Sequence, residues 1–160
     1  MADIKTKYAA SAAVNITLAS LKSTSARASS AISNAVPLFL DAFIQLKLTS
    51  TVTGVSASGT VNVYAYGSID GGLTYSDNAK GINTAHSFST DPPNVRLIGI
   101  MNVNKNNSVF QGPPMSVAAA FGGILPDKWG IIVHNRTGVS IRNSASQTQA
   151  SYKGVWTQSV

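Results

Sequence analysis

The sequence contains no cysteine and no glutamate. Without cysteine, the chain can form neither a disulfide crosslink nor a thiolate metal site. All six acidic residues are aspartates, so the good helix former glutamate is missing. Valine, isoleucine, threonine and tyrosine are plentiful instead, and the composition therefore favours β-strands.

Long hydrophobic runs are also missing. The longest apolar runs, VPLFLDAFI (36–44) and VAAAFGGIL (117–125), fall well short of the roughly 20 residues of a membrane-spanning helix. The first 21 residues lack the continuous apolar core that follows the charges of a signal peptide. We therefore expect no membrane partner, and a soluble chain that is made and used without secretion.

Charge is sparse and mostly positive. Charged residues make up 11% of the chain, well below the usual quarter, and the net charge is +6. Only the first 27 residues are enriched in cations, with Lys5, Lys7, Lys22 and Arg27 against Asp3. This excess serves either solubility or contact with an acidic partner surface. No dense basic cluster with interleaved aromatic residues is present, so we expect no specific nucleic-acid binding.

Hydrophobic alternation predicts an all-β chain with an antiparallel β-sandwich fold of jelly-roll-like type. Every even position from Leu38 to Leu48 is apolar, which indicates a long half-buried strand. Further strands are expected at 61–69, around 86–88, and at 95–103, 115–121, 129–135, 139–143 and 152–160. Eight to ten short strands without a strong helix or a repeat favour a sandwich or jelly roll.

The first 36 residues are small, polar and weakly patterned. We assign 1–36 to an extended N-terminal arm with a first strand near 13–19, and 37–160 to the β-sandwich domain. A terminal segment with so little apolar area is weakly ordered alone, and it becomes ordered against a partner.

The stretch SIDGGLTY (68–75) fits the Asp-box of sialidases and other β-propeller glycosidases. A propeller needs repeated blades, and a glycosidase usually needs two positioned carboxylates. One copy is present, and the aspartates fall in separate loops, so we interpret the motif as the turn of a hairpin. Asp70 would accept backbone N–H bonds, and Gly71 and Gly72 would supply positive φ angles.

Other residues that carry chemistry are few. His86 and His134 are the only histidines, and no Gly-x-Ser-x-Gly elbow accompanies them, so both are interpreted as surface or structural. Asp70 and Asp77 bracket a loop that offers a weaker calcium possibility, although their spacing matches no EF-hand. We expect no cofactor, no metal site and no enzymatic activity.

The segments VNVYAYGSIDGGLTYSDN, NVRLIGIMNV, GPPMSVAAAFGGILPDKWGIIVHNRTG and YKGVWTQ together resemble a group of small virion structural proteins of tailed bacteriophages. The similarity runs from about Leu38 to Val155, as an order of strand segments without a catalytic motif. It implies a non-enzymatic protein of a capsid or tail, assembled in the host cytoplasm and located in the virion.

Within that resemblance, a capsid decoration (cement) protein is the leading expectation. It would bind the outer capsid surface, contact the major capsid protein or other virion proteins, and form a homo-oligomer, with a trimer favoured. Two alternatives stay open: a collar, tail or baseplate component, and a carbohydrate- or receptor-binding module. In the latter, Trp129 and Trp156 would stack on sugars rather than serve as core or interface anchors.

Interfaces between permanently associated subunits are poor in charge at their centres, as this sequence is. The candidate subunit-interface residues combine the cations of the first segment with aromatic residues that contribute packing or interface area. They are Lys5, Lys7, Arg27, Tyr64, Tyr66 and Trp156.

Overall fold

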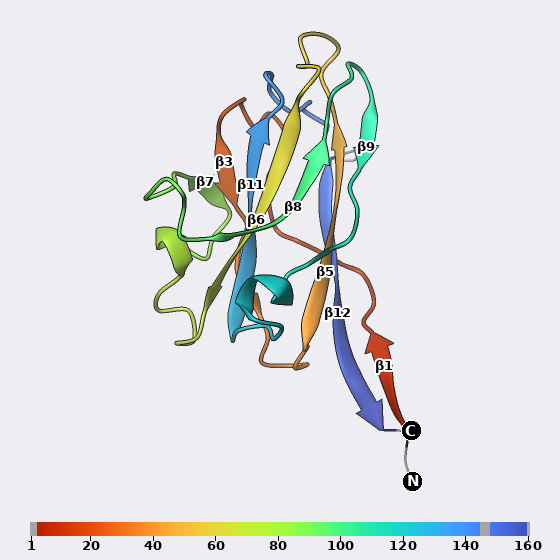
Figure 1. Cartoon of the computed structure of the whole chain (residues 1–160), viewed down its shortest axis with the longest axis vertical. Helices are drawn as coiled ribbons and strands as arrows, with labels where there is room; N and C mark the ends of the chain where they lie inside the picture. The colour runs from red at the N-terminus through yellow and green to blue at the C-terminus, as the bar shows by residue number, and fades with distance from the viewer. Residues whose placement is uncertain (1–2, 145–147, 160) are drawn as a thin grey trace.

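The regular secondary structure is almost entirely antiparallel β-strand. The computed structural model describes residues 3–144 and 148–159, and no α-helix occurs in these two ranges (Figure 1). Two short 3₁₀ turns, Ser76–Asn78 (η1) and Ala118–Phe121 (η2), interrupt the strands. The all-β class is confirmed, in keeping with a sequence rich in β-branched residues and without glutamate.

The first sheet is built around two long strands, β5 and β12, which pair with each other. The order along the sheet is β1-β12-β5-β10, with β2 also on β12 and β9 also on β5. The strand bounds are β1 Ile4–Tyr8, β2 Ala12–Ala13, β5 Asp41–Thr49, β9 Val109–Gln111, β10 Met115–Ser116 and β12 Gln149–Ser159.

The second sheet is built around β6 and β11, which pair from Lys128↔Ser68 to Arg136↔Thr60. Its order is β7-β3-β11-β6-β8, with β4 also on β11. The strand bounds are β3 Ala26–Ala28, β4 Ile32–Ser33, β6 Thr60–Ser68, β7 Thr84–His86, β8 Arg96–Asn102 and β11 Lys128–Arg136.

One hydrophobic core joins the two sheets. The even-numbered residues of β5 that the alternation predicted to be buried, from Ala42 to Leu48, are all fully buried. They share a cluster with Val61 and Val63 of β6 and with Ile131 of β11. The inner faces of both sheets therefore exclude water from the same apolar cluster, which is the main stabilising term in such a fold.

The same alternation fails at its beginning. Leu38 and Leu40 precede β5 and are exposed, because the strand begins only at Asp41. The N–H of Leu40 donates to the carbonyl of Val155 at 2.8 Å, and Phe39 is held by Asn34 instead of a neighbouring strand. These aliphatic side chains therefore lie in a loop at the end of the body.

The expected division at residue 36 does not separate two packing units. Residues 12–33 supply β2, β3 and β4, and Val14 and Leu18 are part of the core cluster. The strand expected near 13–19 is limited to Ala12–Ala13. The short apolar side chains of this segment are buried because the strands β11 and β12 lie beside it.

The hairpin expected at 68–75 is wrong. Both edges of β6 are already occupied, by β11 on one side and β8 on the other. The chain after Ser68 therefore cannot fold back onto β6. It continues through η1 to β7, which pairs with β3, so the turn opens a long connection.

Two other expected strands also differ. The strand at 115–121 ends after two residues, because the Asp41 carboxylate accepts the Ala118 N–H at 2.8 Å and the chain turns into η2. Residues 139–143 form no strand. There, the Ile141 N–H donates to a loop carbonyl, that of Leu21, at 2.9 Å.

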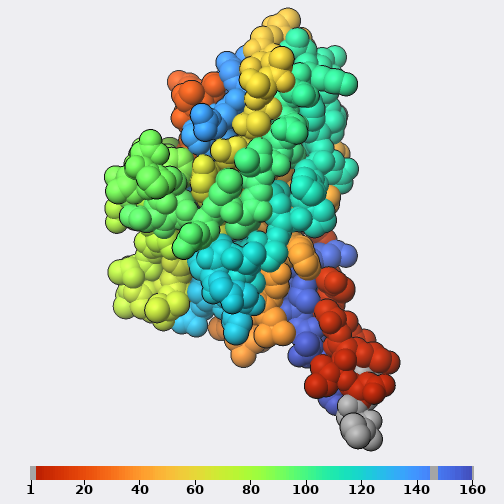
Figure 2. All heavy atoms as spheres, viewed as in Figure 1, coloured from red at the N-terminus to blue at the C-terminus, as the bar shows by residue number. Residues whose placement is uncertain are grey.

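A two-stranded ribbon projects from the body. It consists of β1 and the C-terminal part of β12, paired from Tyr8↔Val155 at its base to Ile4↔Ser159 at its tip. Figures 1 and 2 show it leaving the body at one end of the long axis. All five residues of β1 are exposed, so the ribbon has no core of its own.

Candidate interaction surface

Large aliphatic side chains are exposed on three loops at the end from which the ribbon projects (Figure 1). We call this group the apolar end; its side chains are between 44% and 91% exposed. They are Val36, Leu38, Leu40, Ile69, Leu73 and Ile124. A shallow hollow between the loops is lined by Leu38, Leu40 and Ile124. Grouped exposed apolar side chains of this kind mark interaction sites on soluble proteins.

The loop that carries Val36 and Leu38 is held in place by Asn34. The Asn34 Oδ1 accepts the Phe39 N–H at 2.9 Å, and the Asn34 Nδ2 donates to the Phe39 carbonyl at 3.0 Å. The Asn34 N–H donates to the Asp127 carbonyl at 2.8 Å. Because both ends of the loop are fixed, a partner that binds it loses little entropy in ordering it.

Phe39 also connects this loop to the base of the ribbon. Its ring lies against Gly154, where an added Cβ would come within 2.4 Å of the ring. The same ring packs on Trp156 of β12 at a centroid distance of 5.8 Å. The apolar end and the ribbon are therefore parts of one continuous surface.

The Asp70 turn shapes the second loop of the apolar end. The Ser68 hydroxyl donates to Asp70 Oδ1 at 2.5 Å, and the Thr74 hydroxyl donates to Oδ2 at 2.6 Å. The N–H groups of Leu73 and Thr74 also donate to this carboxylate, at 3.0 and 3.1 Å. These bonds, that from Ser68 first, hold the pKa of Asp70 well below its usual range.

The glycines of this turn have different roles. Gly71 and Gly72 have φ angles of 73° and 95°, which L-residues resist. An added Cβ at Gly72 would lie 2.6 Å from the Tyr75 hydroxyl, whereas Gly71 is open to solvent. The result is a fixed turn that leaves the side chains of Ile69 and Leu73 exposed.

Asp77 organises the connection that follows. Its carboxylate accepts the Ser89 hydroxyl at 2.5 Å and the Asn94 N–H at 3.1 Å, and it contacts His86 Nε2 at 3.0 Å. Burial raises the pKa of Asp77, but the bonds from Ser89, His86 and Asn94 together outweigh burial and lower it. The oxygens of Asp77 are thus occupied by donors of the chain itself. No group of three metal-ligating side chains occurs among the described residues.

Both histidines lie in strands of the second sheet and pack against residues of the adjoining connections. His86 lies at the end of β7 with its side chain buried against Asp77. His134 lies within β11, edge-on to Phe88 at 5.4 Å. Burial is the main cause that lowers the pKa of His134. The two residues serve packing and hydrogen bonding here.

The aromatic candidates for the interface divide into three cases. Tyr66 is fully buried, and its hydroxyl donates to the Ser29 carbonyl at 2.6 Å, so its assignment to an interface is wrong. Burial raises the pKa of Tyr66 to about 12. Tyr64 is half-buried against Phe88, with ring centroids 5.3 Å apart. Trp156 is half-buried at the base of the ribbon.

The cationic candidates also differ. Lys5 and Lys7 are exposed on β1. Arg27 lies in β3, where its Nε donates to Asn83 Oδ1 at 2.8 Å, so it helps to fix the connection before β7. The structure therefore brings Lys5, Lys7 and Trp156 together in the ribbon and places Arg27 in the other sheet.

The chain has an excess of positive charge. All 12 lysine and arginine residues lie in the described ranges, and none forms an ion pair with a carboxylate there; the one pair is His86–Asp77. Asp41, Asp70 and Asp77 accept hydrogen bonds from their own chain. These aspartates remain charged, but the cations outnumber the acidic residues and the net charge is +6, so the surface can attract a partner of opposite charge.

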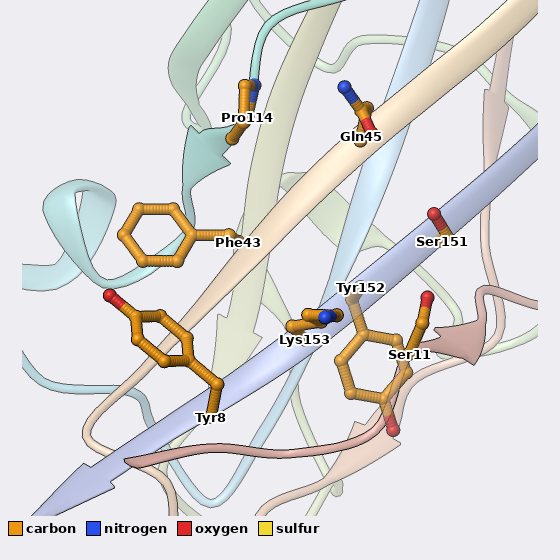
Figure 3. Close-up of a pocket in the computed structure, with 8 residues that line it drawn as sticks. All are labelled: Tyr8, Ser11, Phe43, Gln45, Pro114, Ser151, Tyr152 and Lys153. Carbon is orange, nitrogen blue, oxygen red and sulfur yellow. The ribbon is translucent and has the colours of Figure 1, made fainter. Parts of the chain in front are cut away.

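An apolar groove lies beside the ribbon on the first sheet (Figure 3). Its volume is about 370 Å³, and its aromatic lining includes Tyr8 and Phe43, whose rings lie 6.5 Å apart. Pro114 and Lys153 also line it. The groove extends the apolar character of the ribbon onto the body.

Sequence reasoning missed the apolar end, because it placed Leu38 and Leu40 in a buried strand. The signal that could have indicated a loop is the Val36-Pro37 pair at its start, since proline is disfavoured inside a central strand. No helix in the described part of the chain is long and apolar enough to cross a membrane. Comparison with known families finds no matching family model, and comparison with curated proteins finds no match.

Proposed function

We propose that the chain is a non-enzymatic structural protein of a bacteriophage virion, and specifically a capsid decoration protein. In this role it binds the outer capsid surface, contacts the major capsid protein and stabilises the head as a homo-oligomer, with a trimer favoured. The virion assignment rests on the resemblance of the strand segments between about Leu38 and Val155 to such proteins.

One observation carries the proposal: the side chains of β1 and of the apolar end are exposed, and the contact of Phe39 with Trp156 connects the two regions. An isolated two-stranded ribbon is only marginally stable in water, so it gains from being covered. Many modest contacts of this kind, repeated over a shell, together hold a particle firmly.

The finer fold belongs to the same proposal. We assign the two sheets to a β-sandwich of jelly-roll-like topology, with β1 as the extended N-terminal arm. β1 is paired with β12 and contributes no buried side chain, so its exposed side chains can contact a neighbouring virion protein. The strands β3 and β4, which also lie within the first 36 residues, pair with β11 in the second sheet.

The sugar-binding alternative is less well supported. Trp129 is fully buried, so its ring cannot stack on a glycan. Trp156 is itself packed on Phe39.

A collar, tail or baseplate protein is present in far fewer copies per particle than a capsid decoration protein. The copy number therefore decides between these two positions.

The experiment is quantitative mass spectrometry of purified virions of the phage that encodes the chain, scaled to the major capsid protein. Hundreds of copies per particle are expected for a decoration protein. A few dozen or fewer would place it in a ring of the collar, tail or baseplate, and absence from the particle would overturn the proposal. Particles that lack the chain should also lose their integrity at a lower temperature.

A further inference from the structure

The outer edge of β1 is not paired with another strand in the described chain. The hydrogen-bond pattern between β1 and β12 shows which backbone groups of β1 point toward that edge. The Ala9 N–H donates to the Gly154 carbonyl at 2.9 Å, so odd-numbered residues direct their N–H and C=O groups toward β12. In an antiparallel pair the intervening residues direct theirs away. The N–H and C=O groups of Ile4, Thr6 and Tyr8 therefore face outward, with no partner in the described chain.

Side chains alternate between the two faces of this strand. Lys5 and Lys7 share one face, and Ile4, Thr6 and Tyr8 share the other. Across the ribbon, Lys5 is opposite Gln158 and Lys7 is opposite Trp156, so neither lysine has a carboxylate as its cross-strand neighbour. The edge thus presents two unpaired cations on one face and uncharged side chains on the other.

A second copy of the chain is a poor occupant for this edge. If two copies paired antiparallel with their β1 strands in full overlap, Lys5 of each copy would lie opposite Lys7 of the other. Registers shifted by two residues would still place Lys5 or Lys7 opposite itself. Like charges directly opposite each other destabilise a strand pair, and lysine on an open edge discourages self-association.

We propose that the edge of β1 binds an extended acidic segment of another protein, which adds a strand to the first sheet. The residues of the added strand that lie opposite Lys5 and Lys7 are also two positions apart. The segment therefore carries two acidic residues separated by one other residue. Apolar residues that flank the pattern lie opposite Ile4 and Tyr8. Backbone bonds supply affinity in this mode, and side chains supply specificity.

The groove beside the ribbon supports one side chain of the edge strand. Tyr8 belongs both to the edge strand and to the groove lining, where its ring lies 6.5 Å from that of Phe43 (Figure 3). The apolar residue opposite Tyr8 therefore lies beside a ring that is itself in contact with Phe43.

This inference deepens the proposed function and rests on it only for the source of the segment, a capsid or other virion protein. The test therefore uses no particle. A fluorescein-labelled peptide of sequence Thr-Val-Glu-Thr-Glu-Val-Thr is titrated with the full chain, and its anisotropy is measured. A matched peptide with lysine in place of both glutamates serves as the charge control.

The parent chain should bind the glutamate peptide more tightly than the lysine peptide. In the double variant Lys5→Glu/Lys7→Glu the preference should reverse, with affinity for the glutamate peptide reduced about ten-fold because two cross-strand charge pairs are lost. Both lysines are exposed, so the thermal stability of the variant should match that of the parent.

Thr6→Pro separates strand addition from simple charge attraction. It removes an outward-facing donor, leaves the bonds between β1 and β12, and keeps both lysines; proline is tolerated at such edge positions. Loss of peptide binding in Thr6→Pro, with retention in Thr6→Ser, is the expected result. Equal binding by Thr6→Pro and the parent, or no preference for the glutamate peptide, would overturn the inference. Copy number in the virion is measured separately, so either proposal can fail alone.

Discussion

Trp129 of β11 and Tyr152 of β12 meet edge to face across the two sheets, with ring centroids 5.3 Å apart and an angle of 88° between the rings. Trp129 is fully buried, and its indole N–H has no hydrogen-bond acceptor within the described chain. The largest side chain of the core therefore contributes through packing, and a buried donor without an acceptor carries a desolvation cost.

This contact predicts losses of different size for two substitutions of one residue. Trp129→Ala leaves a large cavity and should lower the free energy of unfolding by about 3–5 kcal/mol. Trp129→Phe keeps most of the ring contact and removes the unpaired N–H, so the loss should be much smaller. Urea denaturation measures both. Equal losses would mean that the ring packing is not what stabilises this region.

The two glycines of the Asp70 turn make a matched pair. Gly71→Ala and Gly72→Ala both place a Cβ at a positive φ, which costs about 1–2 kcal/mol. Only at Gly72 does the added Cβ also collide with Tyr75 and Lys128, at 2.6 and 2.9 Å. Gly72→Ala should therefore lower the melting temperature more than Gly71→Ala, as differential scanning calorimetry would show. The reverse order would contradict the described turn.

Local pattern and long-range pairing explain what the sequence could and could not predict. The burial of Ala42 and Leu46 followed from alternation within one strand, which is a local property. Tyr66 was named as an interface candidate, but it is buried, and its burial depends on Ser29 and on Gly130, which lie far from it in the sequence. Gly130 leaves room for the Tyr66 ring, and an added Cβ would lie 2.4 Å from it.

The candidate surface was predicted only in part, for the same reason. Lys5, Lys7 and Trp156 were named as interface candidates from charge and aromatic character, and the β1–β12 pairing brings them together. That pairing joins the two ends of the chain, and no local pattern encodes it. Likewise, the exposure of Leu38 depends on Asn34, whose side chain fixes the loop before β5 begins.

Asp70 predicts a pH dependence of stability. Its pKa is lower in the folded chain than the ordinary value of 3.8, so its contribution is fully present above pH 4 and is lost as the pH falls toward the folded pKa. Asp70→Asn should lower the melting temperature at pH 7, and the difference from the parent should shrink in more acidic buffer. Asp91→Asn, at an exposed position, is the control and should change little at either pH. A difference for Asp70→Asn that is constant from pH 7 to pH 2 would argue against hydrogen bonding to the charged form.

The apolar end gives the most direct test of the proposed function. Val36→Asp places a charge on a side chain that is 91% exposed, within a loop held by Asn34, so folding should be unaffected. Binding to a partner surface should fall strongly, because the new carboxylate would be desolvated in the contact. Co-sedimentation with particles that lack the chain measures this binding. Val52→Asp makes the same change at an exposed position in the loop between β5 and β6, at the opposite end of the body, and should bind like the parent (Figure 1). If both variants bind equally well, the apolar end is not the contact surface, and the ribbon alone would have to carry the attachment.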